Sequence, residues 1–160
     1  MASPNVMYEE ELQQITKVCN DLTRAANAKV VFLVDKNGQL IASTGETAGL
    51  DTTSLASLTA GNIAATGGIA KLINEKEFSQ IFHEGERDNL HISIVGGRVI
   101  LVVIFDNRSS LGLVRLRVKK GSEELAHIFQ QLQKKAESPG GGGAPFAEIT
   151  DEDIDNLFSE

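Results

Sequence analysis

The residues best suited to metal binding or nucleophilic catalysis are few in this chain and far apart. The three histidines, His83, His91 and His127, follow no metal-ligand spacing, and Cys19 is the only cysteine. A zinc site needs ligands at short characteristic spacings, and a nucleophilic thiol needs a neighbouring base. Cys19 lies on the apolar side of a helical pattern, which favours a buried structural thiol. We therefore expect no metal site, and we interpret each histidine as a surface or partly buried structural residue.

Motifs that bind phosphate or a cofactor are also missing from the sequence. No GxxxxGK[ST] loop and no GxGxxG turn follows a strand pattern. Gly61, Gly67 and Gly68 lie inside a helical pattern instead. The sequence therefore singles out no catalytic residue and no cofactor, although a pair of catalytic carboxylates stays open because acidic residues are numerous.

Charge and composition restrict the partners and the compartment. Of the net charge of −7, residues 146–160 carry −6 and leave −1 for residues 1–145. An acidic segment disfavours nucleic acid and anionic membranes, because phosphate binding needs Lys or Arg. A single cysteine fits a reducing cytosol. The N-terminus has no signal-peptide pattern, and the longest apolar run, residues 99–105, is too short to span a bilayer. We expect a cytoplasmic protein with protein partners and no membrane insertion.

Hydrophobic periodicity predicts two helices and a hairpin in the first half of the chain. A helix over about 7–27 would bury Leu12, Ile15, Cys19, Leu22 and Ala26. Strands at 29–35 and 39–45 flank Lys36-Asn37-Gly38, where Asn-Gly supplies the positive φ angles of a tight turn. A second helix, about 53–73, would be capped by Asp51, Thr52 or Thr53. Its predicted apolar stripe is Leu55, Leu58, Ala65, Ile69, Leu72 and Ile73.

The second half predicts three strands and one helix. The strands are 90–95, 98–105 and 111–120, with 98–105 central in the sheet, and 74–89 is ambiguous between a helix end, a loop and a short edge strand. A helix beginning near Ser122 would bury Leu125, Ile128, Phe129 and Leu132. The order α-β-β-α-β-β-β-α predicts an α/β fold of the α+β sandwich type. Its five-stranded antiparallel sheet would have helices on both faces and an open edge that invites a second copy.

Three regions follow from this pattern. Residues 1–137 are the predicted folded domain, and 138–145, with four consecutive glycines, are a flexible linker. Residues 146–160 are an acidic amphipathic tail, in which Thr150 and Asp153 resemble a capping box. Its apolar residues are expected to bind a partner: Phe146, Ile149, Ile154, Leu157 and Phe158. The alternative is a disordered tail that only keeps the protein in solution.

Small residues occupy one side of the second helix. At 100° per residue, one sector away from the apolar stripe contains Ser57, Ala60, Gly61, Ala64, Gly68 and Lys71. Because glycine destabilises a helix, an ordinary solvent-facing side would be rich in Glu and Lys instead. We interpret this sector as a docking face for a second subunit, a partner, or both. The alternative is that the small side packs against the protein's own sheet.

The segment DTTSLASLTAGNIAATGGIAKL (51–72) and the order of elements resemble the Roadblock family of dynein-light-chain-like GTPase regulators. The stretches NAKVVFLVDKNGQLI, VILVVIFDNRSSLGLVRLRVKK and TDEDIDNLFSE are similar to bacterial gliding-motility members of that family. The resemblance extends from about Met7 to Glu160. The linker, with its four consecutive glycines, departs from it, so the length and flexibility of this connection can differ.

The resemblance implies a Roadblock domain that forms a homodimer, with the second helices side by side on one face of a joined sheet. It implies that a GTP-bound Ras-like small GTPase docks there, with Ala60, Ala64 and Gly68 as the contact floor, and that GTP hydrolysis accelerates. The tail would reach a second surface of the GTPase. Cell polarity, gliding motility and recruitment to a cell pole would follow.

The arginines suggest how hydrolysis would be accelerated. None of the six falls on the small-residue side of the second helix: Arg24, Arg87, Arg98, Arg108, Arg115 and Arg117. We therefore expect the dimer to order the switch regions of the GTPase without supplying an arginine finger. The alternative is an adaptor dimer that binds the GTPase or other polarity proteins and leaves turnover unchanged. An enzyme is the third possibility, and the missing catalytic constellation disfavours it.

Overall fold

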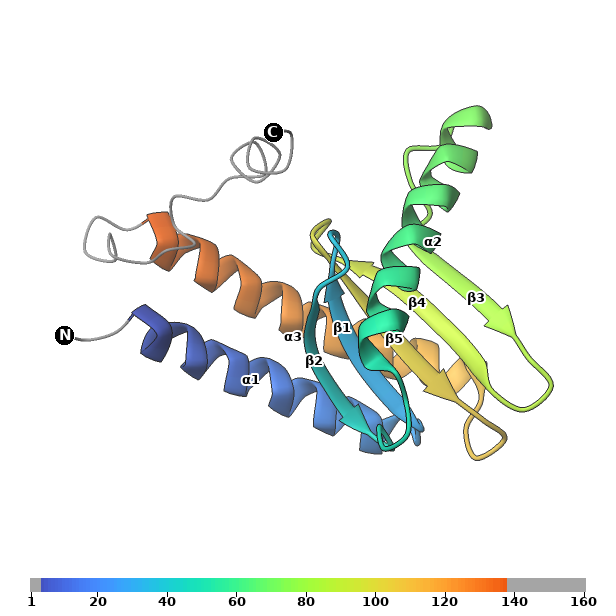
Figure 1. Cartoon of the computed structure of the whole chain (residues 1–160), viewed down its shortest axis with the longest axis horizontal. Helices are drawn as coiled ribbons and strands as arrows, with labels where there is room; N and C mark the ends of the chain where they lie inside the picture. The colour runs from blue at the N-terminus through green and yellow to red at the C-terminus, as the bar shows by residue number, and fades with distance from the viewer. Residues whose placement is uncertain (1–3, 138–160) are drawn as a thin grey trace.

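The computed structural model describes residues 4–137, which form three helices and five strands (Figure 1). The elements in chain order are α1 (Pro4–Ala25), β1 (Val30–Asp35), β2 (Leu40–Gly45), α2 (Thr52–Leu72), β3 (Gln80–Glu84), β4 (Asn89–Val95), β5 (Val99–Phe105) and α3 (Leu111–Glu137). The strands form one antiparallel sheet in the order β2-β1-β5-β4-β3. The predicted α+β sandwich and its order of elements are confirmed.

Strands β5 and β1 lie at the centre of the sheet because their sequences are almost continuously apolar. All seven residues of β5 are buried, as are the first five of β1. A strand with no polar alternation needs cover on both faces, and the helices supply it. In Figure 1, α2 crosses one face of the sheet, and α1 and α3 lie against the other. The prediction of a central strand at 98–105 is confirmed.

The hairpin turn between β1 and β2 differs in one detail from the prediction. Gly38 has a φ of 91°, but Asn37 does not have a positive φ. The Gly38 amide donates to the Asp35 carbonyl at 3.0 Å, and the amides of Asn37 and Gln39 both donate to the Asp35 carboxylate at 2.9 Å. One left-handed glycine after an ordinary turn is typical of a three-residue hairpin loop. The predicted Gly96-Gly97 turn is confirmed, with both φ angles positive.

Helices α1 and α3 bury their apolar side chains against one face of the sheet and form a hydrophobic core there. Cys19 and Leu22 of α1 and Val118 and Leu125 of α3 are buried against one face of the sheet. At the far end of the layer, Glu11 of α1 forms an ion pair with Lys135 of α3. Of the residues predicted to face inward from the first helix, Ile15, Cys19, Leu22 and Ala26 are buried. Leu12 is 42% exposed, so its assignment to the core was wrong.

The segment 111–120 is helical, and its prediction as a strand was wrong. Helix α3 begins at Leu111 rather than near Ser122, and the Leu113 amide donates to the Ser110 side chain at this end. The buried residues recur at steps of four and three, which is the helical period: Val114, Val118, Gly121, Leu125 and Ile128. The remaining strand is β3, at the sheet edge, within the region that stayed ambiguous. Of the residues predicted for the last helix, Leu125 and Ile128 are buried, and Phe129 and Leu132 are partly buried.

Two further predictions concern the ends and the membrane. The linker at 138–145 and the tail at 146–160 lie outside the described residues, so those predictions stay untested. Within residues 4–137, no helix combines the length and the apolar character that a membrane crossing requires.

Candidate functional site

Helix α2 is fixed at its start by the side chain of Asp51. One carboxylate oxygen of Asp51 accepts a hydrogen bond from the Ser54 amide at 3.0 Å, and the other accepts from the Ser54 hydroxyl at 2.6 Å. These two bonds, which favour the ionised form, lower the pKa of Asp51. Of the three residues predicted to cap this helix, Asp51 is therefore the one that does so.

The buried residues of α2 are all small. They are Ala56, Thr59 and Ala70, with Leu55 and Ile63 partly buried. The sheet face beneath them carries large side chains: Val30, Phe32, Val34, Ile92, Ile100 and Val102. Because the strands already fill the space, only small side chains let the helix approach at close-packed distances.

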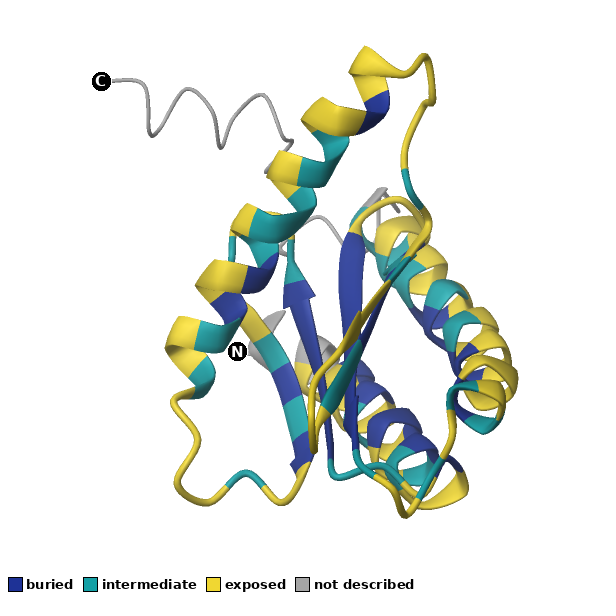
Figure 2. Cartoon of the chain, turned by 90° about the vertical axis from the view of Figure 1, so that its right-hand side faces the viewer, coloured by how far each residue is buried: buried dark blue, intermediate teal, exposed yellow. Residues whose placement is uncertain are grey.

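Four large apolar residues of α2 and its C-cap are exposed rather than packed in the protein's own core. Leu58 is 72% exposed, Ile69 52%, Leu72 85% and Ile73 57%. These four residues are hereafter the apolar face of α2, and Figure 2 shows the outer side of the helix exposed along its length. Ala65 is also exposed, and only Leu55 of the predicted stripe is partly buried. Most of the predicted apolar stripe is therefore exposed, because the side that packs inward is set by the volume left above the sheet.

The predicted small-residue sector lies next to the apolar face. Ser57, Gly61, Ala64, Gly68 and Lys71 are exposed, and Ala60 is partly buried. A Cβ atom built at Gly61 or Gly68 would meet nothing within 4 Å. The turn before β2 flanks the sector, since a Cβ at Gly38 would lie 3.3 Å from the Cα of Ser57. The structure thus brings these six residues together on one surface, whereas the five predicted tail residues lie outside the described part of the chain.

The edge of the sheet below α2 is open. Strand β3 pairs with β4 on one side, and in the described part of the chain no strand pairs with its other side. Ile81 packs toward the core beneath α2, and Phe82, on the opposite face, stacks on Phe105 with ring centroids 6.1 Å apart. An unpaired strand edge presents free backbone donors and acceptors. The apolar face of α2 and the β3 edge are the features that sequence reasoning missed or left ambiguous. The sequence signal that could have revealed the exposed apolar face is that α2 has apolar residues on more than one side.

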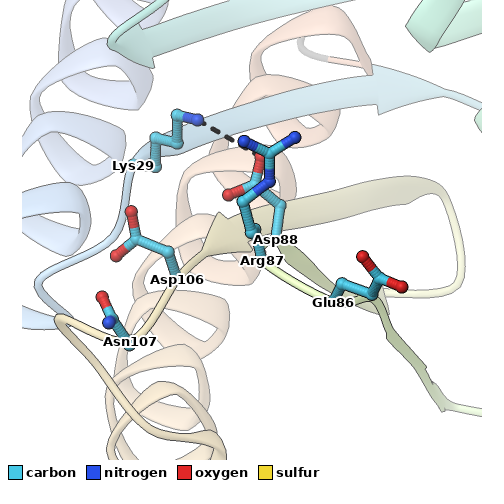
Figure 3. A pocket seen from close by; sticks show the side chains of 6 residues that line it. All are labelled: Lys29, Glu86, Arg87, Asp88, Asp106 and Asn107. Atoms are coloured by element: carbon cyan, nitrogen blue, oxygen red, sulfur yellow. Dashed lines mark hydrogen bonds and ion pairs between the residues drawn. The ribbon is translucent and has the colours of Figure 1, made fainter.

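A polar pocket of about 510 Å³ lies at one end of the sheet (Figure 3). Its lining residues are Lys29, Glu86, Arg87, Asp88, Asp106 and Asn107. Lys29 donates to Asp88 at 3.2 Å, and Arg108, hydrogen-bonded through both its side chain and its amide, lowers the pKa of Asp106 to about 2. These charges neutralise one another. None of the α2 residues singled out from the sequence lines this pocket.

Cys19 and His91 are buried. Burial raises the pKa of the Cys19 thiol to about 12, so the reactive thiolate is disfavoured, as the helical pattern predicted. His91 is only 1% exposed, more deeply buried than expected, and burial, followed by the charge of Arg115, lowers its pKa. Across residues 4–137, no group of three or more His, Cys, Asp or Glu side chains is placed to hold a metal ion.

Comparison with known proteins places the chain in a family. The Roadblock/LC7 domain model matches residues 14–105, which extend from α1 through β5. The chain therefore belongs to the Roadblock/LC7 family, as the resemblance of its central segment predicted.

Solved structures of MglB proteins are similar to it. Myxococcus xanthus MglB is 68% identical with a TM-score of 0.75, and the match covers 77% of this chain and 92% of MglB. The gliding protein MglB from Thermus thermophilus is 33% identical with a TM-score of 0.71, covering 76% and 92%. An MglB with a tetrameric arrangement is 31% identical with a TM-score of 0.72, covering 76% and 91%. No match was found among curated protein sequences.

Proposed function

We propose that this chain is a regulator of a Ras-like small GTPase of the MglA type, and that it accelerates GTP hydrolysis as a homodimer. The observation that carries the proposal is the exposed surface of α2, where the apolar face adjoins the small-residue sector. Membership of the Roadblock/LC7 family and 68% identity to an MglB support it. A role in gliding motility and cell polarity, in the cytoplasm and at a cell pole, is part of the same proposal and draws on a relative described as a gliding protein.

We propose a homodimer because leaving the apolar face of α2 exposed to water is energetically unfavourable. Burying one leucine side chain contributes about 1.5–3 kcal/mol, and Leu58 and Leu72 are both largely exposed. Placing two α2 helices side by side would bury their apolar faces, and pairing two β3 edges would satisfy free backbone groups. A relative with a tetrameric arrangement supports self-association in this group of proteins.

The mechanism proposed for the GTPase is ordering of its switch regions. Helix α2 contains no arginine: Arg24, Arg115 and Arg117 belong to the opposite helical layer, and Arg87, Arg98 and Arg108 lie in turns. A docked dimer would hold the attacking water and the GTPase's own catalytic groups in place, which is the positioning that phosphoryl transfer requires. Loss of turnover with intact binding after any one Arg→Ala change would contradict this mechanism.

The tail is proposed to contact a second surface of the GTPase. Phe146, Ile149, Ile154, Leu157 and Phe158 would fold as a short helix on binding, because a helix of this length is unstable alone. Deleting residues 139–160 should leave the dimer intact and change GTPase affinity or nucleotide exchange. Identical nucleotide kinetics would reduce the tail to a solubilising segment.

The experiment that tests the proposed function is GTP hydrolysis by the cognate GTPase with this protein titrated in. Stimulation that saturates at about two chains per GTPase is expected for an activating dimer. Tight binding with an unchanged hydrolysis rate would contradict activation and favour the alternative, an adaptor dimer. Inactive protein is excluded as a trivial cause by measuring binding in the same samples.

A further inference from the structure

Helix α3 carries a basic patch on the layer opposite α2. We define the basic patch as Arg115, Arg117, Lys119 and Lys120, together with Leu116. All five are exposed, and Leu116 is 62% exposed. Within residues 4–137 none of the four cations forms an ion pair. Glu123 and Glu124 follow one turn later and end the patch.

The patch concentrates, within six residues of one helix, four cations that form no ion pair among residues 4–137. On the neighbouring helix α1, Lys17 and Arg24 both pair with Asp21, and elsewhere Lys29 pairs with Asp88. Arg115 and Lys119 instead stand four residues apart on one helix, where like charges repel. A solvated helix surface has no need of an exposed leucine among such charges. A patch with an apolar centre and a surplus of cations is suited to an acidic amphipathic ligand.

The chain itself contains a segment of that chemistry. Residues 146–160 carry six acidic residues and no Lys or Arg, with Ile154, Leu157 and Phe158 at helical spacing. We propose that, in the absence of a partner, this tail docks on the basic patch of its own α3. Its acids face the four cations, and its apolar side covers Leu116.

The length of the chain permits this contact. From Lys120 to Glu137, the end of α3, is about 26 Å at 1.5 Å per helical residue. The eleven residues from Glu137 to Glu148 span up to about 36 Å when extended. As a Gly-rich coil the same segment averages roughly 17–20 Å, so the acids from Asp151 onward reach the patch with only moderate extension of the linker. Helix α3 is continuous from Leu111 to Glu137 (Figure 1), so the proposed docking requires the tail to turn back along the exposed side of this helix.

When the tail is docked on α3, it is not available to a partner. Release of the tail from α3 would therefore regulate its binding to the GTPase. A GTPase that binds the tail would have to displace it from α3, so the basic patch would set how readily the tail is available. This consequence rests on the proposed function of the tail, whereas the docking itself is a property of the protein alone.

Paramagnetic relaxation measured on the full-length protein without GTPase tests the proposal. A nitroxide is attached at Ser159→Cys, and Cys19 is spared because it is buried with a raised pKa. We expect selective broadening of the amide signals of residues 112–123. It should be lost in about 0.5 M NaCl, where charges are screened within a few ångströms, and lost in Lys119→Glu/Lys120→Glu. The matched control Lys36→Glu/Arg98→Glu reverses two exposed charges in the β1–β2 and β4–β5 turns, outside the basic patch, and should retain the broadening.

Four outcomes would overturn the proposal. One is absence of broadening at residues 112–123, and another is broadening that survives the α3 charge reversal. The third is a protein that shows no broadening but floats with phosphatidylserine vesicles, and stops floating when the basic patch is reversed in charge. That result would make the patch a membrane contact. Broadening in a mixture of spin-labelled and isotope-labelled chains would contradict docking on the same chain. Should the reversal disturb the fold, Arg117→Gln/Lys120→Gln replaces it. Because no GTPase is present, failure here is distinct from failure of GTPase activation.

Discussion

Ala64 is the residue at which the small-residue sector is most directly tested. It is exposed on α2 between Gly61 and Gly68, so a longer side chain has room in the protein alone. In a close helix contact an arginine would not fit. We expect Ala64→Arg to weaken binding of the GTPase by more than about tenfold, equivalent to 1.4 kcal/mol, with an unchanged melting temperature. Titration calorimetry measures the affinity.

Ala64→Ser is the matched control for this change, because serine remains small and should bind like the wild type. Unchanged affinity of Ala64→Arg would remove this side of α2 from the interface. A lowered melting temperature would instead mean that Ala64 supports the fold, contrary to its exposed position.

His91 predicts a pH dependence of stability. It is buried on β4 beneath α3, where its Nδ1 atom has no partner among residues 4–137, and its Nε2 lies 3.4 Å from the Gln80 side chain. Burial and Arg115 lower its folded pKa below the usual 6.5. Since the unfolded state then takes up the proton first, this histidine's contribution to stability is present above about pH 6.5 and is lost as pH falls through the folded pKa.

The measurement is urea unfolding of wild type and His91→Gln at about pH 7.5 and pH 5.5. The free energy of unfolding of wild type should fall more on acidification than that of the variant, because glutamine has no proton to gain. The difference between the two proteins removes the common effect of the carboxylates. An equal fall in both would show that His91 does not titrate in this range.

At the scale of elements, α3 shows why a strand was predicted where a helix formed. In residues 111–120, Arg115 and Arg117 alternate with Val114, Leu116 and Val118, which is compatible with a half-buried strand. The helical period becomes visible only when Val114 and Val118 are joined to Gly121 and Leu125 across the whole of α3. Strand β3 was left ambiguous for the opposite reason, because an edge strand with mostly exposed residues has no apolar alternation.

Helix α2 shows a second limit. Its existence, its start at Asp51 and the exposure of most of its small residues follow from local chemistry. Which side faces inward does not, because that depends on the large residues of strands far away in sequence. The usual rule that the larger apolar side is the core assumes a single chain, and the apolar face of α2 violates it. The sequence therefore located the candidate surface, whereas the exposure of the adjoining apolar stripe is known only from the structure.

Gly121 gives a prediction about the packing of α3 on α1. It is buried in the middle of α3, and a Cβ there would lie 3.4 Å from a methyl carbon of Leu22, an ordinary contact distance. Alanine favours the helix over glycine by roughly 0.5–1 kcal/mol. We expect Gly121→Ala to be more stable than wild type by about this amount in thermal or urea unfolding.

Gly121→Leu is the comparison, because a larger side chain would push into Leu22 and overpack the layer. That change should destabilise the protein by about 1–3 kcal/mol. If alanine also destabilised, the α1–α3 distance in solution would have to be shorter than in this structure.

At the scale of the whole molecule, the two faces of the sheet are unequal. One is covered by α1 and α3, whose interior sides are buried, and the other by α2 alone, which leaves its apolar face in water (Figure 2). This asymmetry separates the proposed roles. Self-association and GTPase binding are assigned to the α2 layer, and the basic patch belongs to the other. The sequence is divided between a nearly neutral domain and an acidic tail, and we propose that this tail contacts the basic patch of that second layer.

Leu72→Asp tests whether the apolar face of α2 holds two chains together. Leu72 is 85% exposed, so an aspartate there leaves the fold of one chain intact. In a two-fold symmetric interface the substituted residue is present in both chains, so the loss of binding free energy is doubled. Losing two leucines at about 1.5 kcal/mol each amounts to about 3 kcal/mol, or roughly 100-fold in the dimer dissociation constant. Sedimentation equilibrium should therefore show wild-type dimers and Leu72→Asp monomers at the same concentration.

The matched control is Leu116→Asp, which places the same charge at an exposed leucine in the opposite helical layer. It should remain a dimer, because α3 lies on the far side of the sheet from the proposed contact. Dissociation of both variants would point to a general effect of added charge. Dissociation of Leu116→Asp alone would move the interface to α3, and would leave the apolar face of α2 to the GTPase.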